Sequence, residues 1–474
     1  MYTRVNNMST LALTPPLSGY SSAGIQSAFD KTGTNAGQKL KYDEVHFSPG
    51  QYILNSRMYL NSDTKITCDP GVIWKLEKTN FGQLPLVGQK ESTISGLDIS
   101  GIQYDGQYPI QTDTPNDHGL GYGNFINLLN VKNSKFHDLK GGHNEGDILR
   151  LQGGDNIEIY NCNITEPGHT FTFLQAMSNV SAHDNYIEMR ADNAFRVKES
   201  NRVKVFRNRI KGTPQAYSDG IQIERISENP LFSIEIFENI ITDTYGPAIN
   251  AFSTLPNNNS VNIHNNLISR CGQMPHDNKL PGVGGIIFDG IEDIKIWNNT
   301  IVDCFGYGVA ATQYIAQAST AKNLKALVQR NIITGTKVSN YAGSMSGSGI
   351  ADLSAGRYSI TSQENCLFKN LTPYCKITSA SDIYVDPLFT DPTNGDYHLQ
   401  SKPSMPCVFH DYELGAFNGV TGAAEFIPPD LPCVCIPQGD EEKLKVLCQE
   451  LLASGFIKSF DCLKFSHVSK DFEV

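Results

Sequence analysis

Two short segments of the chain, residues 194–198 (AFRVK) and residues 220–224 (GIQIE), alternate apolar with polar residues. Strict alternation over four to eight residues is typical of a half-buried β-strand whose polar side chains point outward. The polar positions are Arg196, Lys198, Gln222 and Glu224. If the two strands are neighbours, two cations, an amide and a carboxylate share one face. Such a face could bind an anionic polymer and act on it by acid–base chemistry.

Equivalent positions in the flanking segments extend this polar face. The outward residues there are predicted to be Arg150 and Gln152, Thr172 and Leu174, Asn250 and Phe252, and Ile287 and Asp289. The turns that lead into these strands add His143, Glu145, Asp147, His169, Asp192, Asp219 and Tyr245. Parallel strands lie about 4.8 Å apart, so these residues would form ladders along the face. A network of structural salt bridges would give the same pattern, and the sequence leaves that alternative open.

Two reactions on an anionic polysaccharide fit these residue types. Glycoside hydrolysis needs one carboxylic acid and a second carboxylate. The candidate pairs are Asp219 with Glu224, and Glu145 with Asp147. β-Elimination instead needs a neutralised uronate and a base, for which Lys198, Arg196 or His169 could serve. Hydrolysis is preferred, and the residues predicted to bind the substrate are Arg150, Arg196, Gln222, His143, Asp192, Tyr245 and Asn250.

A repeat organises the chain around these strands. The motif x-Asn-x-Ile, or a close variant, recurs every 23 to 34 residues. Repeats of this length indicate a solenoid. The recurring amides are Asn185, Asn208, Asn239, Asn266, Asn299, Asn331 and Asn365. Amides stacked at one turn can bond along the column and to turn carbonyls, so these residues are predicted to be structural.

The predicted fold is all-β: a single-stranded right-handed parallel β-helix of about nine to eleven coils. This domain should cover residues 20–415, with a capping helix over residues 22–31 that closes an otherwise exposed sheet edge. Residues 1–19 are predicted to form an N-terminal arm. Residues 416–474 are predicted to form a small C-terminal extension with a candidate helix over residues 440–454.

The composition limits the partners. The chain has 474 residues and a net charge of −11, which argues against generic binding to nucleic acid or to anionic membranes. A local basic cluster can still bind an anionic polysaccharide. No apolar run of about 18 residues is present, so no membrane span is expected. Monomer and homotrimer are both compatible with the sequence.

The N-terminus lacks the apolar region of a signal peptide. We nevertheless expect an extracellular, cell-surface or virion-associated protein whose export signal has been removed or is not used. The 11 Cys residues follow no standard zinc spacing. The sequence therefore predicts neither a metal site nor another cofactor, and it leaves a calcium requirement open.

An ordered run of segments resembles the disaggregatases of methanogenic archaea. The run includes GGHNEGDILRL, EPGHTFTF, YSDGIQIE and VGGIIFDGIEDIKIWNNTI. Members of that family look like parallel β-helix enzymes that cut methanochondroitin, a cell-wall polymer containing uronate and galactosamine. The resemblance implies a polysaccharide-degrading cleft over residues 143–250, and it assigns no catalytic residue.

Three other hypotheses remain open. A lyase would leave unsaturated uronate at the new chain ends. A non-catalytic adhesin or tailspike-like protein would bind the polymer without shortening it. A purely structural solenoid would do neither.

Overall fold

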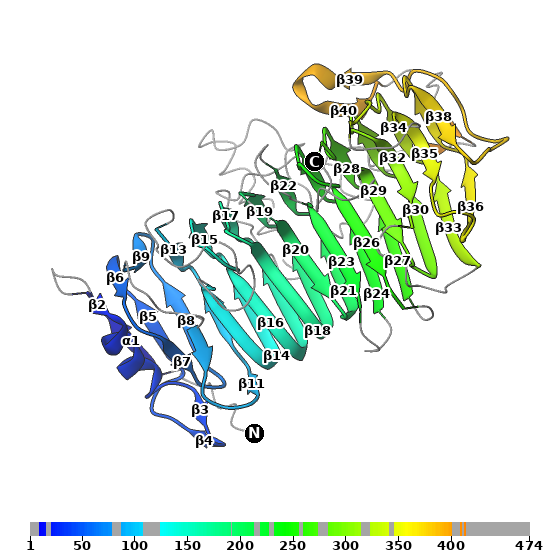
Figure 1. Ribbon diagram of the computed structural model, residues 1–474. Helices are drawn as coiled ribbons and strands as arrows, with labels where there is room; N and C mark the ends of the chain where they lie inside the picture. Colours follow the sequence, from blue (N-terminus) through cyan, green and yellow to red (C-terminus); the bar gives the residue numbers. More distant parts are fainter. Residues whose placement is uncertain are drawn as a thin grey trace, which may run out of the picture. The chain divides into compact units, whose positions relative to one another are not determined.

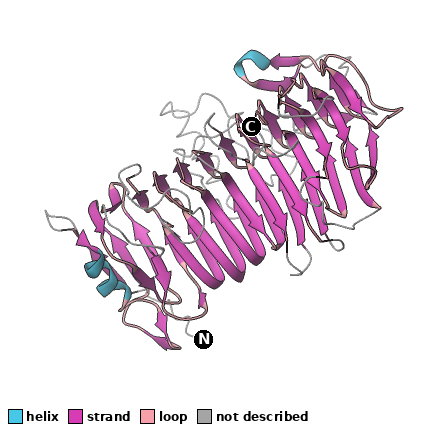
Figure 2. Cartoon of the chain, viewed as in Figure 1, coloured by secondary structure: helices cyan, strands magenta, loops and turns pink. Residues whose placement is uncertain are grey.

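The computed structural model describes residues 9–15, 20–77, 87–107, 124–190, 192–212, 219–226, 232–255, 259–273, 283–313, 323–340, 346–400, 408–409 and 412–413. Over these ranges the chain forms a parallel β-helix, as predicted. Strands of successive coils pair in parallel into one sheet of 23 strands and one of 13 strands (Figure 1). Figure 2 shows how strands dominate the described part of the chain. The predicted C-terminal extension, with its candidate helix, lies outside the described residues.

The larger sheet folds into two faces. The long strand β18 (Thr170–His183) shows the division, because its first half pairs with β20 (Asn193–Lys198) and its second half with β21 (Asn201–Phe206). We call the face that contains β20 the site face. Its other strands are β7 (Met58–Leu60), β10 (Val87–Gln89), the first halves of β14 (Ile126–His137) and β16 (Leu149–Tyr160), β23 (Ile221–Arg225), β26 (Ile249–Ser253), β29 (Gly284–Asp289), β32 (Tyr307–Ala311), β35 (Ser348–Asp352) and β38 (Thr372–Cys375).

The second face contains β21 and the second halves of the long strands. Its other strands are β1 (Thr10–Leu13), β5 (Glu44–Phe47), β8 (Lys65–Cys68), β11 (Ile94–Ser95), β12 (Asp98–Ser100), β24 (Phe232–Phe237), β27 (Asn259–His264), β30 (Asp293–Trp297), β33 (Leu324–Gln329) and β36 (Tyr358–Gln363). β1 falls within the segment predicted as an N-terminal arm, and it pairs with β5.

The 13-stranded sheet forms the third face. Its strands are β2 (Tyr20–Ser21), β6 (Gly50–Leu54), β9 (Val72–Leu76), β13 (Gln103–Asp105), β15 (Lys140–Gly142), β17 (Asn163–Thr165), β19 (Tyr186–Glu188), β22 (Arg209–Lys211), β25 (Ile240–Thr242), β28 (Leu267–Ser269), β31 (Thr300–Val302), β34 (Ile332–Thr334) and β37 (Cys366–Phe368).

Short elements accompany the three faces. The helix α1 (Ser22–Phe29) begins at the predicted residue and buries Ile25 and Phe29. The others are β3 (Thr34–Asn35), β4 (Gln38–Lys39), β39 (Phe389–Asp391), the 3-10 helix η2 (Pro392–Asn394), β40 (Asp396–Leu399), β41 (Val408–Phe409) and β42 (Tyr412–Glu413). No helix in the described ranges is long and apolar enough to cross a membrane.

Alternation along the strands fills the core, as the sequence predicted. Phe195 and Val197 of β20, and Ile221 and Ile223 of β23, are each at most 1% exposed. Burial of such side chains from all three faces supplies the main stabilisation, on the order of 1.5–3 kcal/mol for each large apolar residue. The polar residues between them are left to cover the outer surface.

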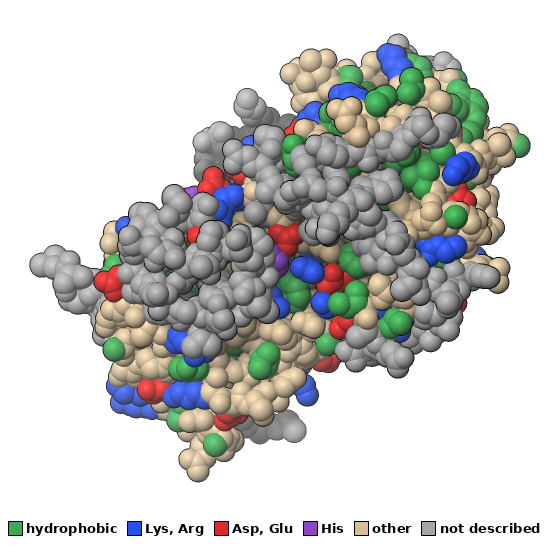
Figure 3. Space-filling model, viewed as in Figure 1, with side chains coloured by type: hydrophobic (Ala, Val, Ile, Leu, Met, Phe, Trp, Pro, Cys, Tyr) green, Lys and Arg blue, Asp and Glu red, His purple; other side chains and the backbone are tan. Residues whose placement is uncertain are grey.

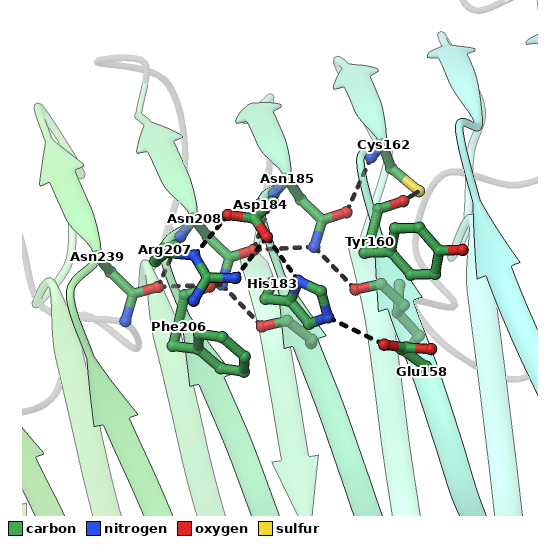
Figure 4. Close-up of polar contacts among 12 residues, drawn as sticks. Glu158, Tyr160, Cys162, His183, Asp184, Asn185, Phe206, Arg207, Asn208 and Asn239 are labelled. Atoms are coloured by element: carbon green, nitrogen blue, oxygen red, sulfur yellow. Dashed lines mark hydrogen bonds and ion pairs between the residues drawn. The ribbon is translucent and has the colours of Figure 1, made fainter. Parts of the chain in front are cut away.

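The recurring Asn residues form a continuous hydrogen-bonded ladder at one turn. The side chain of Asn208 accepts hydrogen bonds from the backbone and Nδ2 of Asn185, and its own Nδ2 donates to Asn239 at 3.0 Å (Figure 4). The same arrangement continues coil by coil to Asn365, whose Nδ2 donates to Asp382 at 3.1 Å. The predicted structural role of this column is confirmed.

The ladder also explains how the turns tolerate an unfavourable backbone. The residue before each ladder Asn adopts a left-handed conformation, including Arg207 (φ 51°) and Glu238 (φ 56°). This conformation costs energy for a residue with a long side chain. The amide bonds of the following Asn satisfy buried turn groups and offset that cost.

Removing one amide from the middle of the ladder should destabilise the protein. In Asn239→Ala, the backbone and the Nδ2 of Asn208 lose their acceptor, and the free energy of unfolding is expected to fall by about 2–4 kcal/mol. The matched control is Asn262→Ala on the outer side of β27, which should change stability by less than about 0.5 kcal/mol. Urea unfolding followed by circular dichroism measures both, and equal effects would contradict the structural role of the ladder.

Candidate functional site

The outward residues of the site face form a continuous column. Arg150 of β16 lies in register with Phe173 of β18, and Phe173 lies in register with Arg196 of β20. The column continues through Gln222 of β23 to Asn250 of β26. The sequence therefore placed Arg196 and Gln222 correctly on neighbouring strands.

The outward positions predicted for β18, the strand between those of Arg150 and Arg196, were wrong by one residue. Thr172 and Leu174 point into the core and are fully buried, whereas Phe173 and Gln175 occupy the outward positions. The error has a physical cause. Phe173 is apolar and only 3% exposed although it points outward, because cations cover it, so hydrophobicity gives the wrong direction for this strand.

His169 lies between two carboxyl groups from neighbouring coils. Its Nδ1 lies 2.5 Å from Oδ1 of Asp147, and its Nε2 lies 2.7 Å from Oδ2 of Asp192. We call these three residues the charge row. Asp147 and His169 are buried, whereas the side chain of Asp192 is 16% exposed. The row therefore presents a carboxyl group to solvent at its Asp192 end.

Electrostatics keeps a proton on His169. Burial opposes a charge on this imidazole, but the charges of Asp147 and Asp192 outweigh it and raise the pKa of His169 to about 10. Burial likewise opposes the charge on Asp147, yet His169 and Arg150 together lower the pKa of Asp147. At neutral pH both imidazole nitrogens therefore donate, so His169 has no free lone pair for a proton or a metal ion.

The carboxylate of Glu224 is the common partner of three side chains on β20 and β23. Its two carboxylate oxygens accept from Nη2 of Arg196 at 3.1 and 3.0 Å, and Nζ of Lys198 lies 3.2 Å away. The amide of Gln222 donates to the same carboxylate at 3.3 Å. Burial opposes the charge of Arg196, but Glu224 and Asp192 outweigh it and raise the pKa of Arg196. Arg196 thus joins Glu224 to the charge row, since its Nη1 lies 3.8 Å from Oδ2 of Asp192.

We call the charge row, Arg150 and the group of Arg196, Lys198, Gln222 and Glu224 the cluster. Its cations lie nearer to solvent than most of their partners. The side chains of Arg150, Arg196 and Lys198 are 12%, 22% and 18% exposed. Those of Asp147 and Glu224 are 0% and 4% exposed. In Figure 3, Lys, Arg, Asp, Glu and His side chains gather near the middle of the face that is shown. The arrangement offers guanidinium and ammonium groups to an anionic ligand.

Other residues predicted for the site lie around this cluster or apart from it. Asp219 is fully buried, and its Oδ2 accepts from Asn250 at 2.8 Å. His143 is exposed and lies 3.8 Å from both Asp105 and Glu166, so its carboxylate neighbours lie outside the cluster. Glu145 and Tyr245 are partly buried.

Across the part of the chain that the structure describes, no three His, Cys, Asp or Glu side chains are placed to hold a metal ion.

Comparison with known sequences supports the resemblance. Residues 231–407 match the family model described as "Disaggregatase related", and residues 86–262 match that of the "Right handed beta helix region". The resemblance to the disaggregatases is confirmed. The β-helix region includes the charge row, and the disaggregatase-related part begins after Glu224. No curated protein sequence matches the chain.

Solved structures show the same fold. The A-module of the Azotobacter vinelandii mannuronan C-5 epimerase AlgE6 superposes with a TM-score of 0.57 at 13% identity, covering 77% of this chain and 93% of that one. The A-module of AlgE4 from the same organism gives 0.52 at 13% identity, covering 77% and 96%. At this identity the comparison establishes the right-handed parallel β-helix and nothing about the reaction.

Proposed function

We propose that this disaggregatase-related protein is an extracellular or cell-surface enzyme that hydrolyses an acidic polysaccharide of uronate and amino sugar, such as methanochondroitin. The observation that carries the proposal is the contact between the charge row and the solvent-facing cations. Arg150, Arg196 and Lys198 would bind uronate carboxylates, which guanidinium groups recognise with two parallel hydrogen bonds. Asp192 would meet the polymer beside them.

Hydrolysis fits the protonation of the cluster better than elimination. Elimination needs a base that removes a proton from carbon. His169 holds its proton because neighbouring carboxylates raise its pKa to about 10, and Arg196 holds its proton because a guanidinium group is protonated at any physiological pH. Two of the three candidate bases are therefore ineffective near neutral pH.

Asp192 is the carboxyl group best placed to act in hydrolysis. Its negative charge is stabilised by His169 at 2.7 Å and by Arg196 at 3.8 Å, which favours the role of base or nucleophile. Asp147 and Glu224 are more deeply buried, and they instead hold Arg150, Arg196 and Lys198 in place.

Glu145 is the proposed proton donor to the leaving sugar. It is partly exposed, whereas Asp219 is fully buried. The backbone oxygen of Glu145 also lies against Gly168, where a Cβ would collide with it. Gly168 immediately precedes His169, so this close approach brings the backbone of Glu145 near the charge row.

Incubation with uronate-containing polymers tests the proposal. Methanochondroitin and chondroitin are treated with the protein, and the products are measured by mass spectrometry and ultraviolet absorbance. Hydrolysis is expected to give shorter chains, with one water added for each bond cleaved, and no absorbance from unsaturated uronate. Unsaturated products would identify a lyase instead, and binding without shortening would identify a non-catalytic adhesin or tailspike-like protein.

A further inference from the structure

Phe173 lies between two guanidinium groups on the site face. The guanidinium carbon of Arg150 lies 4.0 Å from the centre of the Phe173 ring, and that of Arg196 lies 5.3 Å from it. The three residues occupy one outward column on consecutive strands. Arg150 comes from β16 and Arg196 from β20, so the ring of β18 connects cations that are two coils apart.

The contacts leave little freedom to either guanidinium group. Asp147 holds Arg150 through Nη1 at 2.9 Å, and Glu224 holds Arg196 through Nη2 at 3.0 Å. The aromatic ring then fixes a face of each group, because a cation is attracted to the negative face of an aromatic ring. Because each guanidinium group is held by one carboxylate and by the Phe173 ring, its remaining N–H groups keep a fixed orientation.

Phe173 is itself too buried to contact a ligand. It is 3% exposed, whereas the side chains of Arg150 and Arg196 are 12% and 22% exposed. A sugar ring therefore meets the guanidinium groups and not the aromatic ring. Any effect of Phe173 on a ligand must pass through the two arginines.

We propose that Phe173 is a positioning residue that holds Arg150 and Arg196 as a preorganised clamp for a uronate carboxylate of the polymer. We call Arg150, Phe173 and Arg196 the guanidinium clamp. An arginine that is already fixed loses less side-chain entropy when it binds, so preorganisation strengthens binding without adding a new contact. The proposal rests on the proposed function for the identity of the ligand, and it deepens that function by naming how the carboxylate is recognised.

Equilibrium binding of chondroitin tests the clamp. Phe173→Leu is expected to weaken binding about five- to tenfold, which is the range that loss of cation–π contacts gives. Phe173→Tyr keeps the ring and should bind within about twofold of the wild type. Chondroitin whose carboxyl groups have been reduced to alcohols should bind the wild type at least about tenfold more weakly. Fluorescence anisotropy of a labelled oligosaccharide measures each affinity.

Phe206 provides a matched control for the loss of an aromatic ring. Phe206 of β21 stacks on His183 and Phe237, and the guanidinium of Arg207 lies 4.5 Å from its ring centre. Phe206→Leu therefore removes a ring and a cation–π contact on the second face, and binding should change less than about twofold. Equal losses in Phe206→Leu and Phe173→Leu would show a general structural effect and would overturn the clamp.

A double-mutant cycle separates positioning from simple loss of stability. Arg150→Lys keeps the positive charge but loses the planar group that stacks on the ring. If Phe173 acts through Arg150, Phe173→Leu should weaken binding less in the Arg150→Lys background than in the wild type. Fully additive effects would contradict the clamp. Should Phe173→Leu fail to fold, Arg150→Lys alone must still weaken binding about fivefold, and an unchanged affinity would overturn the proposal.

The same measurements distinguish this proposal from the proposed enzyme activity. Wild-type protein that binds chondroitin but cleaves neither chondroitin nor methanochondroitin would contradict the proposed enzyme activity, and the clamp would still be supported by its variants. Variants that bind as tightly as the wild type would contradict the clamp whether or not the polymer is cleaved.

Discussion

Replacing Asp192 with asparagine is expected to lower the rate of polymer cleavage at least about 100-fold, the lower end of what a positioned acid–base group contributes. Asparagine keeps the size of the side chain and can still accept a hydrogen bond from Nε2 of His169. It removes the negative charge that hydrolysis requires of a base or nucleophile. The initial rate of chain shortening, measured at saturating polymer, checks the prediction.

Asp184 offers a control because, like Asp192, it pairs with an imidazole and with a guanidinium group. Its Oδ2 lies 2.7 Å from Nδ1 of His183, whose Nε2 lies 3.4 Å from Glu158 (Figure 4). This second imidazole between carboxylates lies beside the Asn ladder, and Asp184 is also paired with Arg207 at 2.7 Å. Asp184→Asn should leave the rate within about twofold, because no part of the proposed reaction uses it. Comparable losses in both variants would show that Asp192 acts through stability and not through chemistry.

The repeating part of the fold could be predicted because each residue there contacts only residues of its own coil and of the next coils. Alternation at 194–198 places Phe195 and Val197 in the core, and the recurring Asn of each coil finds the Asn of the next. These rules depend on local spacing and on the solenoid period, both of which are visible in the sequence.

The charge row could not be assembled from strand alternation alone. Asp147, His169 and Asp192 lie in turns, where side-chain direction follows backbone angles that the sequence does not reveal. A usable signal was present nevertheless. His169 follows Asp147 by 22 residues, about one coil, and Asp192 follows His169 by a similar interval. This interval is why the sequence predicts the three residues along one face, although it does not reveal that His169 contacts both carboxyl groups.

The guanidinium clamp could not be predicted from the sequence for a different reason. Hydrophobicity assigns Phe173 to the core, and only the cation–π contacts with Arg150 and Arg196 explain why an aromatic ring points outward. Phe173 is buried by the side chains of Arg150 and Arg196 on the outer surface and not by side chains in the core. Alternation patterns cannot distinguish these two kinds of burial.

The stability that His169 contributes should depend on pH. Its pKa is raised in the folded protein from an ordinary 6.5 to about 10, because the carboxylates of Asp147 and Asp192 outweigh the effect of burial. A raised pKa means that folding favours the protonated form. The contribution is therefore fully present below about pH 6.5 and is lost as the pH rises through about 10.

The variant His169→Gln isolates this contribution. Below pH 6.5 it should be less stable than the wild type by about 3–5 kcal/mol, and the difference should shrink steadily toward pH 10. Guanidinium unfolding of both proteins at several pH values measures the difference. Burial opposes a charge on His137 too, but Asp138 and Asp98 raise the pKa of His137 to about 9. His137 is present in both proteins, so its titration cancels.

A difference that stays constant with pH would mean that His169 stabilises the fold through packing and not through its charge. The expected decline would instead establish a fixed imidazolium beside Asp192. Such a group gains or loses no proton near neutral pH. Cleavage at neutral pH should then follow the titration of groups other than His169, and His169 would act by stabilising the negative charge of Asp192.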